Sequence, residues 1–432
     1  MKYKIDPQKC ASGEITVPGD KSISHRAIMF ASIAEGETRI TGFLEGEDCL
    51  ATMNAFQQMG VKIERVNEGE LLVHGLGKHG LTQPSGLLDL GNSGTSMRLL
   101  TGLLAGQSIN TTLVGDGSLM KRPMRRVCDP LSVMGAKLKT NTDGTPPVVI
   151  SSVNDLEAIS YELPVASAQV KSAILLAGMY ANGETVVIEP KPTRDHTERM
   201  LMAFGYPIKS QEGTISIQGG LPLSATNIKI PADISSAAFF IVAACIAPEG
   251  QITIHNVGMN PTRTGVIDIL LAMNADIKIH NKKIVGGEPT ASITAKSSQL
   301  KGIVVPTDLV PSAIDEFPIL CIAAACAEGE TRVTNAEELR VKESDRISQV
   351  AKGLNTLGIQ VQEFNDGLTI IGGEMAGGVI KSGHDHRIAM SFTIASLRAS
   401  ESIEITDCEN VATSFPGFVE LANSIGLSVN AK

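Results

Sequence analysis

The stretch ITVPGDKSISHRAIMFASIAEGETRITGF, residues 15–43, contains in short form the unit from which the whole chain is built. Residues 15–17 alternate as a strand does, and Pro18-Gly19-Asp20 interrupts the alternation. The following apolar side chains recur on one helical face, at Ile23, Ala27, Phe30 and Ala34. We therefore expect a strand, a sharp turn and a helix that begins near Lys21.

Two basic residues, Lys21 and Arg26, lie in the first turns of this expected helix. The free backbone N–H groups and the positive end of the helix dipole at this place favour anions. Cations there are unfavourable unless an anionic ligand lies between them. The pattern predicts an anion-binding loop.

A short phrase near the end of this stretch recurs along the chain. Its copies are EGETRI (35–40), AGQSIN (105–110), NGETVV (182–187), EGQITI (249–254), EGETRV (328–333) and ASESIE (399–404). Neighbouring copies start 67 to 79 residues apart, and 432 residues divided by six gives 72, which matches. A second phrase such as MGVKI (59–63) follows each copy, with Gly or Asn where a helix ends. The sequence predicts six βαβαββ units.

The first helices of copies three to five are apolar on all sides. They are VKSAILLAGMYA (170–181), SAAFFIVAACIA (236–247) and FPILCIAAACA (317–327). Helices without a polar face are buried on every side, so the sheets should lie outside them. The expected fold class is α/β, as an inside-out α/β barrel with helices in the middle.

The chain is too long for one hydrophobic core, so we expect two domains. Pro18-Gly19-Asp20 and Pro231-Ala232-Asp233 are matched breaks that open copies one and four. The expected division is residues 21–230 in one domain, and residues 231–432 completed by residues 1–20 in the other. If the three first helices of each domain run parallel, their starts converge, and the active site lies in the cleft between the domains.

Composition limits the classes of function. The longest apolar run, 236–247, is shorter than the ~20 residues of a membrane span, and residues 1–10 have no apolar signal core. A net charge of −9 with no Trp argues against a nucleic-acid partner. We expect a cytoplasmic protein with reduced thiols, no membrane partner and, because every copy is paired within the chain, a monomer.

Several motifs fail as cofactor or metal sites. Gly75, Gly77 and Gly80 have dinucleotide-fingerprint spacing, but Pro84 follows instead of a helix. His384-Asp385-His386 has no partner cluster for a metal. We expect no cofactor and no metal.

Two basic stretches, MKRPMRR (120–126) and EELRVKESDR (337–346), have two interpretations that the residues leave open. Each is either a solvated charged face or part of an anion site. Lys342 and Arg346 have the i, i+4 spacing, which is unfavourable for like charges unless a negative group lies between them.

The motifs taken together resemble those of the 5-enolpyruvylshikimate-3-phosphate synthase family, from about residue 12 to the end. They are PGDKSISHRA (18–27), LGNSGTSMRLL (90–100), GDGSLMKRPM (115–124), SAQVKSA (167–173), RDHTER (194–199), DEFP (315–318), LRVKESDR (339–346) and DHRIAM (385–390). The resemblance implies the enolpyruvyl transferase fold, a two-domain inside-out barrel. It also implies transfer of the enolpyruvyl group of phosphoenolpyruvate to the 5-hydroxyl of shikimate 3-phosphate, through a tetrahedral intermediate, in aromatic amino-acid biosynthesis.

The resemblance also implies roles for individual residues. The implied ligands of shikimate 3-phosphate are Lys21, Ser22, Arg26, Ser167, Ala168, Gln169, Arg194, Asp315 and Lys342. The implied ligands of phosphoenolpyruvate are Lys21, Gly94, Arg122, Gln169, Arg346 and Arg387. The implied catalytic residues are Asp315, which accepts the hydroxyl proton, Glu343, which protonates the methylene carbon, and Lys21. Because both substrates are anionic, we expect the basic residues to repel one another in the empty site and the domains to close on substrate.

Some positions depart from many family members. Glu338-Leu339 replaces Asn-Trp, and Thr413 replaces Lys near the end. With SAQVKSA and RDHTER, these features resemble a second, divergent subclass whose members often tolerate glyphosate, an inhibitor that occupies the phosphoenolpyruvate site. Gly94 leaves space in that site, so we expect at least partial sensitivity.

Two alternatives come from different classes. The sister enzyme, UDP-N-acetylglucosamine enolpyruvyl transferase, has a reactive Cys in the loop before Arg-Pro, where this chain has Asp116 and no Cys. A non-catalytic scaffold that binds phosphorylated metabolites would not need the carboxyls of Asp315 and Glu343. Phosphate release with each co-substrate separates these alternatives.

Overall fold

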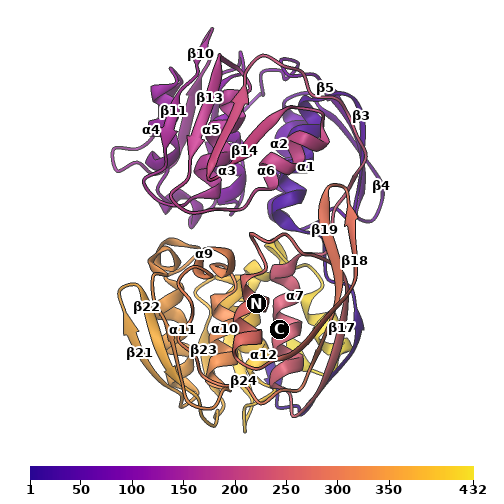
Figure 1. Ribbon diagram of the computed structural model, residues 1–432, viewed down its shortest axis with the longest axis vertical. Helices are drawn as coiled ribbons and strands as arrows, with labels where there is room; N and C mark the ends of the chain where they lie inside the picture. The colour runs from indigo at the N-terminus through magenta and orange to yellow at the C-terminus, as the bar shows by residue number, and fades with distance from the viewer. The chain divides into compact units, whose positions relative to one another are not determined.

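The computed structural model describes residues 1–432, and the chain divides into two compact units (Figure 1). The N-terminal unit is Lys21–Ile230. The C-terminal unit combines Met1–Asp20 with Pro231–Lys432. The chain therefore passes between the units twice, after Asp20 and after Ile230.

The N-terminal unit contains three α-helices that pack into its core and three more that lie farther out. The helices are α1 (Lys21–Ile33), α2 (Glu47–Gln58), α3 (Gly94–Ala105), α4 (Arg125–Val133), α5 (Ala168–Gly178) and α6 (His196–Ala203), with the 3-10 turn η1 (Leu119–Lys121). Almost every side chain of α1, α3 and α5 is buried. Helices α3 and α5 approach closely at Gly102, where a Cβ would lie 2.2 Å from the carbonyl oxygen of Ala173.

Three four-stranded sheets cover these helices, one for each copy of the repeat. Their orders are β16-β3-β5-β4, β6-β7-β9-β8 and β11-β13-β15-β14, and a short pair joins β10 to β12. The strands are β3 (Glu35–Thr41), β4 (Lys62–Asn67), β5 (Glu70–Leu76), β6 (Leu88–Asp89), β7 (Thr111–Val114), β8 (Lys137–Lys139), β9 (Val148–Ser151), β10 (Leu156–Glu157), β11 (Ser160–Glu162), β12 (Ala181–Asn182), β13 (Glu184–Ile188), β14 (Ile208–Gln211), β15 (Thr214–Gln218) and β16 (Ile228–Lys229). In each sheet the first two strands are parallel. In copies two and three these two strands flank the buried helix in the sequence, as in a βαβ unit.

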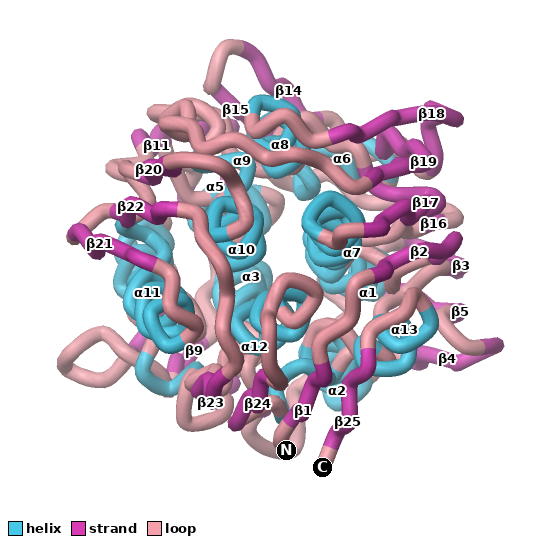
Figure 2. Tube along the Cα trace, turned by 90° about the horizontal axis from the view of Figure 1, so that it is seen from below, coloured by secondary structure: helices cyan, strands magenta, loops and turns pink.

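The C-terminal unit repeats this plan. Its helices are α7 (Ile234–Ile246), α8 (Gly265–Ala272), α9 (Val310–Ala313), α10 (Phe317–Ala325), α11 (Arg346–Thr356), α12 (His386–Ala395) and α13 (Phe418–Ser424), with η2 (Glu337–Val341) and η3 (Glu409–Thr413). Every side chain of α7 and α10 is buried, and α7, α10 and α12 pack against one another in the middle of the unit (Figure 2).

The sheets of the C-terminal unit lie around these three helices (Figure 2). Their orders are β18-β19-β17-β2, β20-β22-β21 and β23-β24-β1-β25. The strands are β1 (Tyr3–Asp6), β2 (Cys10–Ile15), β17 (Glu249–Gly258), β18 (Asp276–Val285), β19 (Glu288–Lys296), β20 (Glu330–Val333), β21 (Gln360–Phe364), β22 (Gly367–Ile371), β23 (Gly378–Lys381), β24 (Ile403–Thr406) and β25 (Ser428–Ala431). In the three-stranded sheet, residues 301–305 take the place of the fourth strand through single bridges to Glu328 and Arg332.

The strand before the first helix differs from the sequence-based expectation. The strand ends at Ile15, and it pairs with β17 of copy four, not with copy one. Copy one instead takes its first strand from β16, which pairs with β3. The N-terminal β1 likewise supplies the last sheet of copy six. The sequence predicts that residues 1–20 complete the C-terminal unit, but sequence periodicity does not say which sheet a strand joins, so these strand pairings were not predicted.

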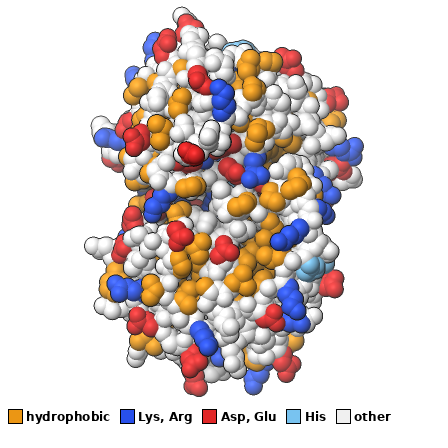
Figure 3. Space-filling model, in the orientation of Figure 1, with side chains coloured by type: hydrophobic (Ala, Val, Ile, Leu, Met, Phe, Trp, Pro, Cys, Tyr) orange, Lys and Arg blue, Asp and Glu red, His pale blue; other side chains and the backbone are white.

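The α/β architecture of helices enclosed by sheets is as predicted. None of the helices combines the length and the apolar character that crossing a lipid bilayer requires. On the face drawn in Figure 3, basic and acidic side chains are interspersed, with no broad region of one charge.

Candidate active site

The start of α1 carries the first cluster of basic residues. The ammonium of Lys21, half-buried, forms an ion pair with the buried carboxylate of Asp48 in α2. The guanidinium of Arg26 is buried and donates hydrogen bonds to the hydroxyl of Thr197 at 2.8 Å, to the hydroxyl of Ser172 at 3.0 Å and to the carbonyl of Ser22 at 3.0 Å. Arg26 thus ties the start of α1 to α5 and α6.

His25 connects α1 to the start of α3. Its ring is buried and lies 2.8 Å from the hydroxyl of Thr52, 3.2 Å from that of Ser96 and 3.4 Å from that of Ser93. Burial, with the nearby charges of Lys21 and Arg26, holds the pKa of His25 well below its usual value. The neutral imidazole therefore serves as a hydrogen-bonding link between helices.

Gly94, the first residue of α3, lies against two guanidinium groups. A Cβ at this position would be 2.8 Å from one nitrogen of Arg122 and 2.9 Å from one of Arg98. Arg98 donates to the side-chain oxygen of Gln169 at 2.7 Å, and Gln169 donates to Thr95 at 3.0 Å. The absent side chain of Gly94 is therefore what allows the guanidinium groups to approach the start of α3.

The start of α5 has its own buried support. The hydroxyl of Ser167 caps the helix by accepting from the backbone N–H of Val170, and Ala168 is the first helical residue. The ammonium of Lys171 pairs with Glu189 at 3.0 Å and with Glu198 at 2.6 Å. Burial raises the pKa of Glu198, with Lys171 acting against it. These pairs fix the segment from Glu189 to Glu198, which contains the half-buried Arg194.

In the C-terminal unit, Arg346 is the centre of a second cluster. Its buried guanidinium, at the first position of α11, donates to Asp385 at 2.9 Å, to Glu343 at 2.5 Å and to Asp315 at 3.5 Å. Asp315 also lies 3.4 Å from the ammonium of Lys342. Arg387 donates to the backbone carbonyl of Asp315 at 2.8 Å. The five residues Asp315, Lys342, Glu343, Arg346 and Arg387, predicted as site residues, are thus in one connected cluster.

Asp385 anchors this cluster from the start of α12. Its carboxylate is fully buried and caps the helix by accepting from the N–H of Arg387 at 2.9 Å. Burial acts to raise its pKa, but the adjacent Arg346 outweighs burial, and the pKa is lowered from its usual value. Asp385 is therefore the buried counter-ion that keeps Arg346 in place.

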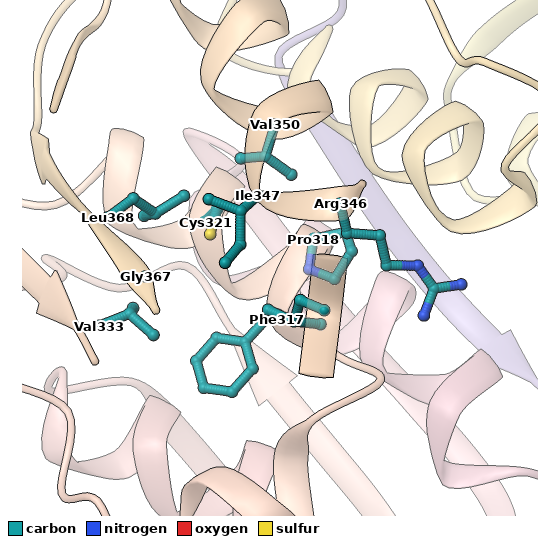
Figure 4. Close-up of a pocket in the computed structure, with 10 residues that line it drawn as sticks. Phe317, Pro318, Cys321, Val333, Arg346, Ile347, Val350, Gly367 and Leu368 are labelled. Atoms are coloured by element: carbon teal, nitrogen blue, oxygen red, sulfur yellow. The ribbon is translucent and has the colours of Figure 1, made fainter. Parts of the chain in front are cut away.

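The chain segment that positions Arg346 is itself packed on an apolar pocket. The pocket is lined by Phe317, Pro318, Cys321, Val333, Leu339, Arg346, Ile347, Val350, Gly367 and Leu368. Figure 4 shows the carbon stem of Arg346 at the edge of this group, with its guanidinium pointing away from the apolar side chains. The stem contributes packing while the charged end stays with the carboxylates.

Two sequence-based expectations need correction. The basic residues of the C-terminal cluster do not simply repel one another in the absence of substrate, because Lys342, Arg346 and Arg387 all contact acidic residues. Lys342 and Arg346 are also not neighbours on a helix, since Lys342 precedes α11. A negative group between Lys342 and Arg346 is expected from their spacing, and Asp315 contacts both of these side chains.

Sequence reasoning gave no role to Asp48, Glu316 and Asp385, although all three contact predicted site residues. The available signal was that Glu316 and Asp385 lie inside the motifs DEFP and DHRIAM. Glu338 lies half-buried in η2, and Thr413 is buried, its hydroxyl donating to the carbonyl of Asn410 at 2.7 Å. No group of three or more His, Cys, Asp or Glu side chains is arranged to hold a metal ion.

Comparisons with known proteins agree over nearly the full length. A family profile described as EPSP synthase (3-phosphoshikimate 1-carboxyvinyltransferase) matches residues 5–421. A protein of that enzyme name from Methylococcus capsulatus is 60% identical over 427 residues, covering 99% of this chain and 98% of the relative. Another from Alkalilimnicola ehrlichii is 59% identical over 430 residues, covering 99% and 96%. The solved structure of EPSP synthase from Acinetobacter baumannii matches with a TM-score of 0.89 and 56% identity, covering 100% of both chains.

The substitution Asp385→Asn tests the buried pair with Arg346. We expect the free energy of unfolding at pH 7 to fall by about 3–5 kcal/mol, because a buried cation loses its counter-ion while the helix cap is kept. The native pKa of Asp385 is lowered, so its contribution is present above pH ~4 and is lost as the pH falls through the native pKa. Urea unfolding should show the difference from wild type shrinking below pH ~4.

The matched control is Glu363→Gln, which removes one partner of the more exposed Arg340. It should cost less than about 1 kcal/mol. Equal stabilities of wild type and Asp385→Asn at pH 7, or a difference that does not change with pH, would contradict the expectation.

Proposed function

This chain belongs to the EPSP synthase family, 3-phosphoshikimate 1-carboxyvinyltransferase, and from that premise we propose how its residues divide the work of the reaction. The enzyme transfers the enolpyruvyl group of phosphoenolpyruvate to the 5-hydroxyl of shikimate 3-phosphate, giving 5-enolpyruvylshikimate 3-phosphate and phosphate. The single observation that carries the assignment is the connected cluster of two carboxylates and three cations around Asp315.

Asp315 is the proposed base for the 5-hydroxyl. Lys342 and Arg346 both lie within 3.5 Å of the same carboxylate oxygen, Oδ1, and their positive charge favours the ionised form that accepts a proton. Glu343 is the proposed acid for the methylene carbon of phosphoenolpyruvate. Addition of an alcohol to the double bond of an enol phosphate needs both functions, and the shared partner Arg346 holds the two carboxyls in one cluster.

The proposed ligands form two sets, one for each substrate. Shikimate 3-phosphate is bound by Lys21, Ser22, Arg26, Ser167, Ala168, Gln169, Arg194, Asp315 and Lys342. Phosphoenolpyruvate is bound by Lys21, Gly94, Arg122, Gln169, Arg346 and Arg387. When the carboxylate and phosphate of phosphoenolpyruvate reach Arg346 and Arg387, they compete with the carboxylates of Glu343 and Asp315 for Arg346 and with that of Glu316 for Arg387. Substrate binding is then an exchange of anionic partners, which leaves the two carboxyls available for proton transfer, while the guanidinium groups stabilise the tetrahedral intermediate.

The base assignment is tested by Asp315→Asn. We expect kcat to fall by about 10²- to 10⁴-fold, since proton transfer by a positioned side chain contributes that much. The measurement is phosphate release from phosphoenolpyruvate with shikimate 3-phosphate as co-substrate. The control is Asp308→Asn, which removes an exposed carboxylate seven residues earlier and should leave kcat unchanged.

The same assay with a UDP-sugar as co-substrate tests the alternative activity, that of a UDP-N-acetylglucosamine enolpyruvyl transferase. Cys128, the cysteine nearest the loop of Arg122, is buried in α4, and burial raises its pKa to about 11, so the thiol stays protonated and unreactive. Turnover with the UDP-sugar and none with shikimate 3-phosphate would overturn the proposal. Unchanged kcat in Asp315→Asn would remove the role of base.

We further propose that the two clusters face a common cleft and that the units close when both substrates bind. Support comes from the division of ligands, since the proposed phosphoenolpyruvate site needs Arg122 of one unit and Arg387 of the other. Small-angle X-ray scattering should show a smaller radius of gyration after shikimate 3-phosphate and glyphosate are added together. An unchanged radius with both ligands bound would contradict closure.

The finer assignment is to the divergent, often glyphosate-tolerant subclass. SAQVKSA, RDHTER, Glu338 and Thr413 support it. Thr413 is buried and occupied with the carbonyl of Asn410, so it offers no cation where many relatives have Lys. Gly94, however, leaves the space beside Arg122 open, which favours retained sensitivity.

Inhibition by glyphosate tests this combination. We expect a wild-type inhibition constant within about tenfold of the KM for phosphoenolpyruvate. Gly94→Ala should raise both constants by about tenfold or more, because its Cβ displaces the guanidinium of Arg122. The control is Gly117→Ala, where a Cβ would meet no atom within 4 Å. A wild-type inhibition constant far above KM would overturn retained sensitivity.

A further inference from the structure

A buried arginine outside the proposed ligand set connects the two passages between the units. Arg263, which precedes α8, is 2% exposed and lies 3.3 Å from the carboxylate of Asp20 and 3.2 Å from that of Asp233. Burial acts to lower its pKa, but the surrounding carboxylates, Asp20 first among them, outweigh burial and raise it. Arg263 is therefore a permanent buried cation.

The two aspartates belong to the segments at which the chain changes units. Asp20 is the last residue before the N-terminal unit, and Asp233 comes three residues after Ile230. The segments are also hydrogen-bonded to each other: Asp20 N–H donates to the carbonyl of Pro231 at 2.8 Å, and Asp233 N–H donates to that of Pro18 at 2.9 Å. Arg263 thus holds both passages through their side chains.

From Arg263 the contacts lead to the substrate cluster. Arg263 donates to the hydroxyl oxygen of Ser235 at 2.6 Å, so the proton of that hydroxyl is directed elsewhere, and Ser235 donates it to Glu316. Glu316 is 0% exposed. The same carboxylate oxygen accepts from Arg387 at 3.3 Å, while the other oxygen is buried without a hydrogen-bond partner. Ser235 and Arg387 are thus the donors that satisfy this buried carboxylate.

A buried carboxylate with few donors holds each of them tightly, because losing one costs its full desolvation. Glu316 therefore competes with an incoming anion for Arg387. The hydroxyl of Ser235 weakens that competition, because it donates a second hydrogen bond to the same carboxylate oxygen. Arg263 donates to the oxygen of that hydroxyl, which favours the orientation in which its proton points to Glu316. Arg263 is in turn fixed by the two passages.

We propose that Arg263, Ser235 and Glu316 are positioning residues that set how available Arg387 is to the anionic substrate and link that availability to the passages between the units. This inference rests on the proposed function of Arg387 as a ligand of phosphoenolpyruvate. These three residues, called the relay below, are not ligands of either substrate in this proposal. They act through Glu316, the carboxylate that Arg387 must release when the substrate binds.

The experiment uses Ser235→Ala in the full chain, with Ser236→Ala as the matched control. Ser236 is the next residue in the first turn of α7 and is also buried. Ser235→Ala leaves Arg387 as the remaining donor to Glu316. We expect the KM for phosphoenolpyruvate, at saturating shikimate 3-phosphate, to rise about tenfold. The Kd of shikimate 3-phosphate alone, by calorimetric titration, should change less than about twofold. Ser236→Ala should change neither.

The second arm combines Ser235→Ala with Glu316→Gln, which removes the charge that Ser235 is proposed to satisfy. In the Glu316→Gln background the added Ser235→Ala should no longer raise the KM, a non-additivity that a merely structural role would not produce. If Ser235→Ala behaves like Ser236→Ala, weakens both ligands alike, or raises the KM equally in the Glu316→Gln background, the relay is overturned.

The failure of the relay and the failure of the proposed function give different results. Arg387→Gln, measured alongside, should raise the KM for phosphoenolpyruvate if Arg387 is its ligand. A raised KM in Arg387→Gln with no effect of Ser235→Ala would contradict the relay alone. An unchanged KM in Arg387→Gln would contradict both the relay and the role of Arg387 as a ligand of phosphoenolpyruvate.

Discussion

Helices without a polar face impose the arrangement on which the rest of this structure depends. All side chains of α7 and α10 are buried, and burying each large apolar side chain contributes about 1.5–3 kcal/mol, so no side of either helix can face water. The sheets must therefore lie outside. The polar groups of such helices are confined to their ends, and the contacts from Ser235 to Glu316 and from Arg387 to Asp315 bring the starts of α7, α10 and α12 together. The charged groups of these three helix starts therefore gather at one end of the unit.

Charges at these helix starts are buried, and buried charges need partners. In the C-terminal unit, Arg346 meets this need with three carboxylates, of which Asp385 is fully buried and structural, while Asp315 and Glu343 are proposed to act on substrate. In the proposed mechanism, the carboxyls of Asp315 and Glu343 neutralise the cation before binding and are released when an anionic substrate takes their place. In that mechanism, the stability of the empty protein and the proposed acid–base function both depend on the guanidinium group of Arg346.

The sequence alone predicts much of this arrangement, and the failures have physical causes. Repeat spacing and all-apolar helices predict the enclosed-helix fold, and basic residues at helix starts predict Lys21 and Arg26 as anion ligands. The partner strand of β2 was not predicted, because alternation specifies a strand and a face but not a partner. Asp48, Glu316 and Asp385 were missed because a buried counter-ion is defined by distance in space, with no fixed spacing from its cation. The helical argument for Lys342 failed because Lys342 precedes the helix, although the negative charge it demanded is supplied by Asp315.

The exchange of strands between the halves of the chain also makes one order of assembly entropically favourable. The N-terminal unit is contiguous, and its pair of β16 with β3 brings both of its ends to one sheet. The C-terminal unit needs β1 and β2, which are separated in sequence from β17 by more than the whole N-terminal unit. Closing so long a loop in an open chain costs conformational entropy that grows with its length. Once β16 has paired with β3, that loop is already closed, so Asp20 and Pro231 are adjacent and the β2–β17 pair forms at little further entropic cost. The cation of Arg263 between Asp20 and Asp233 then stabilises the junction of the two segments at which the chain changes units.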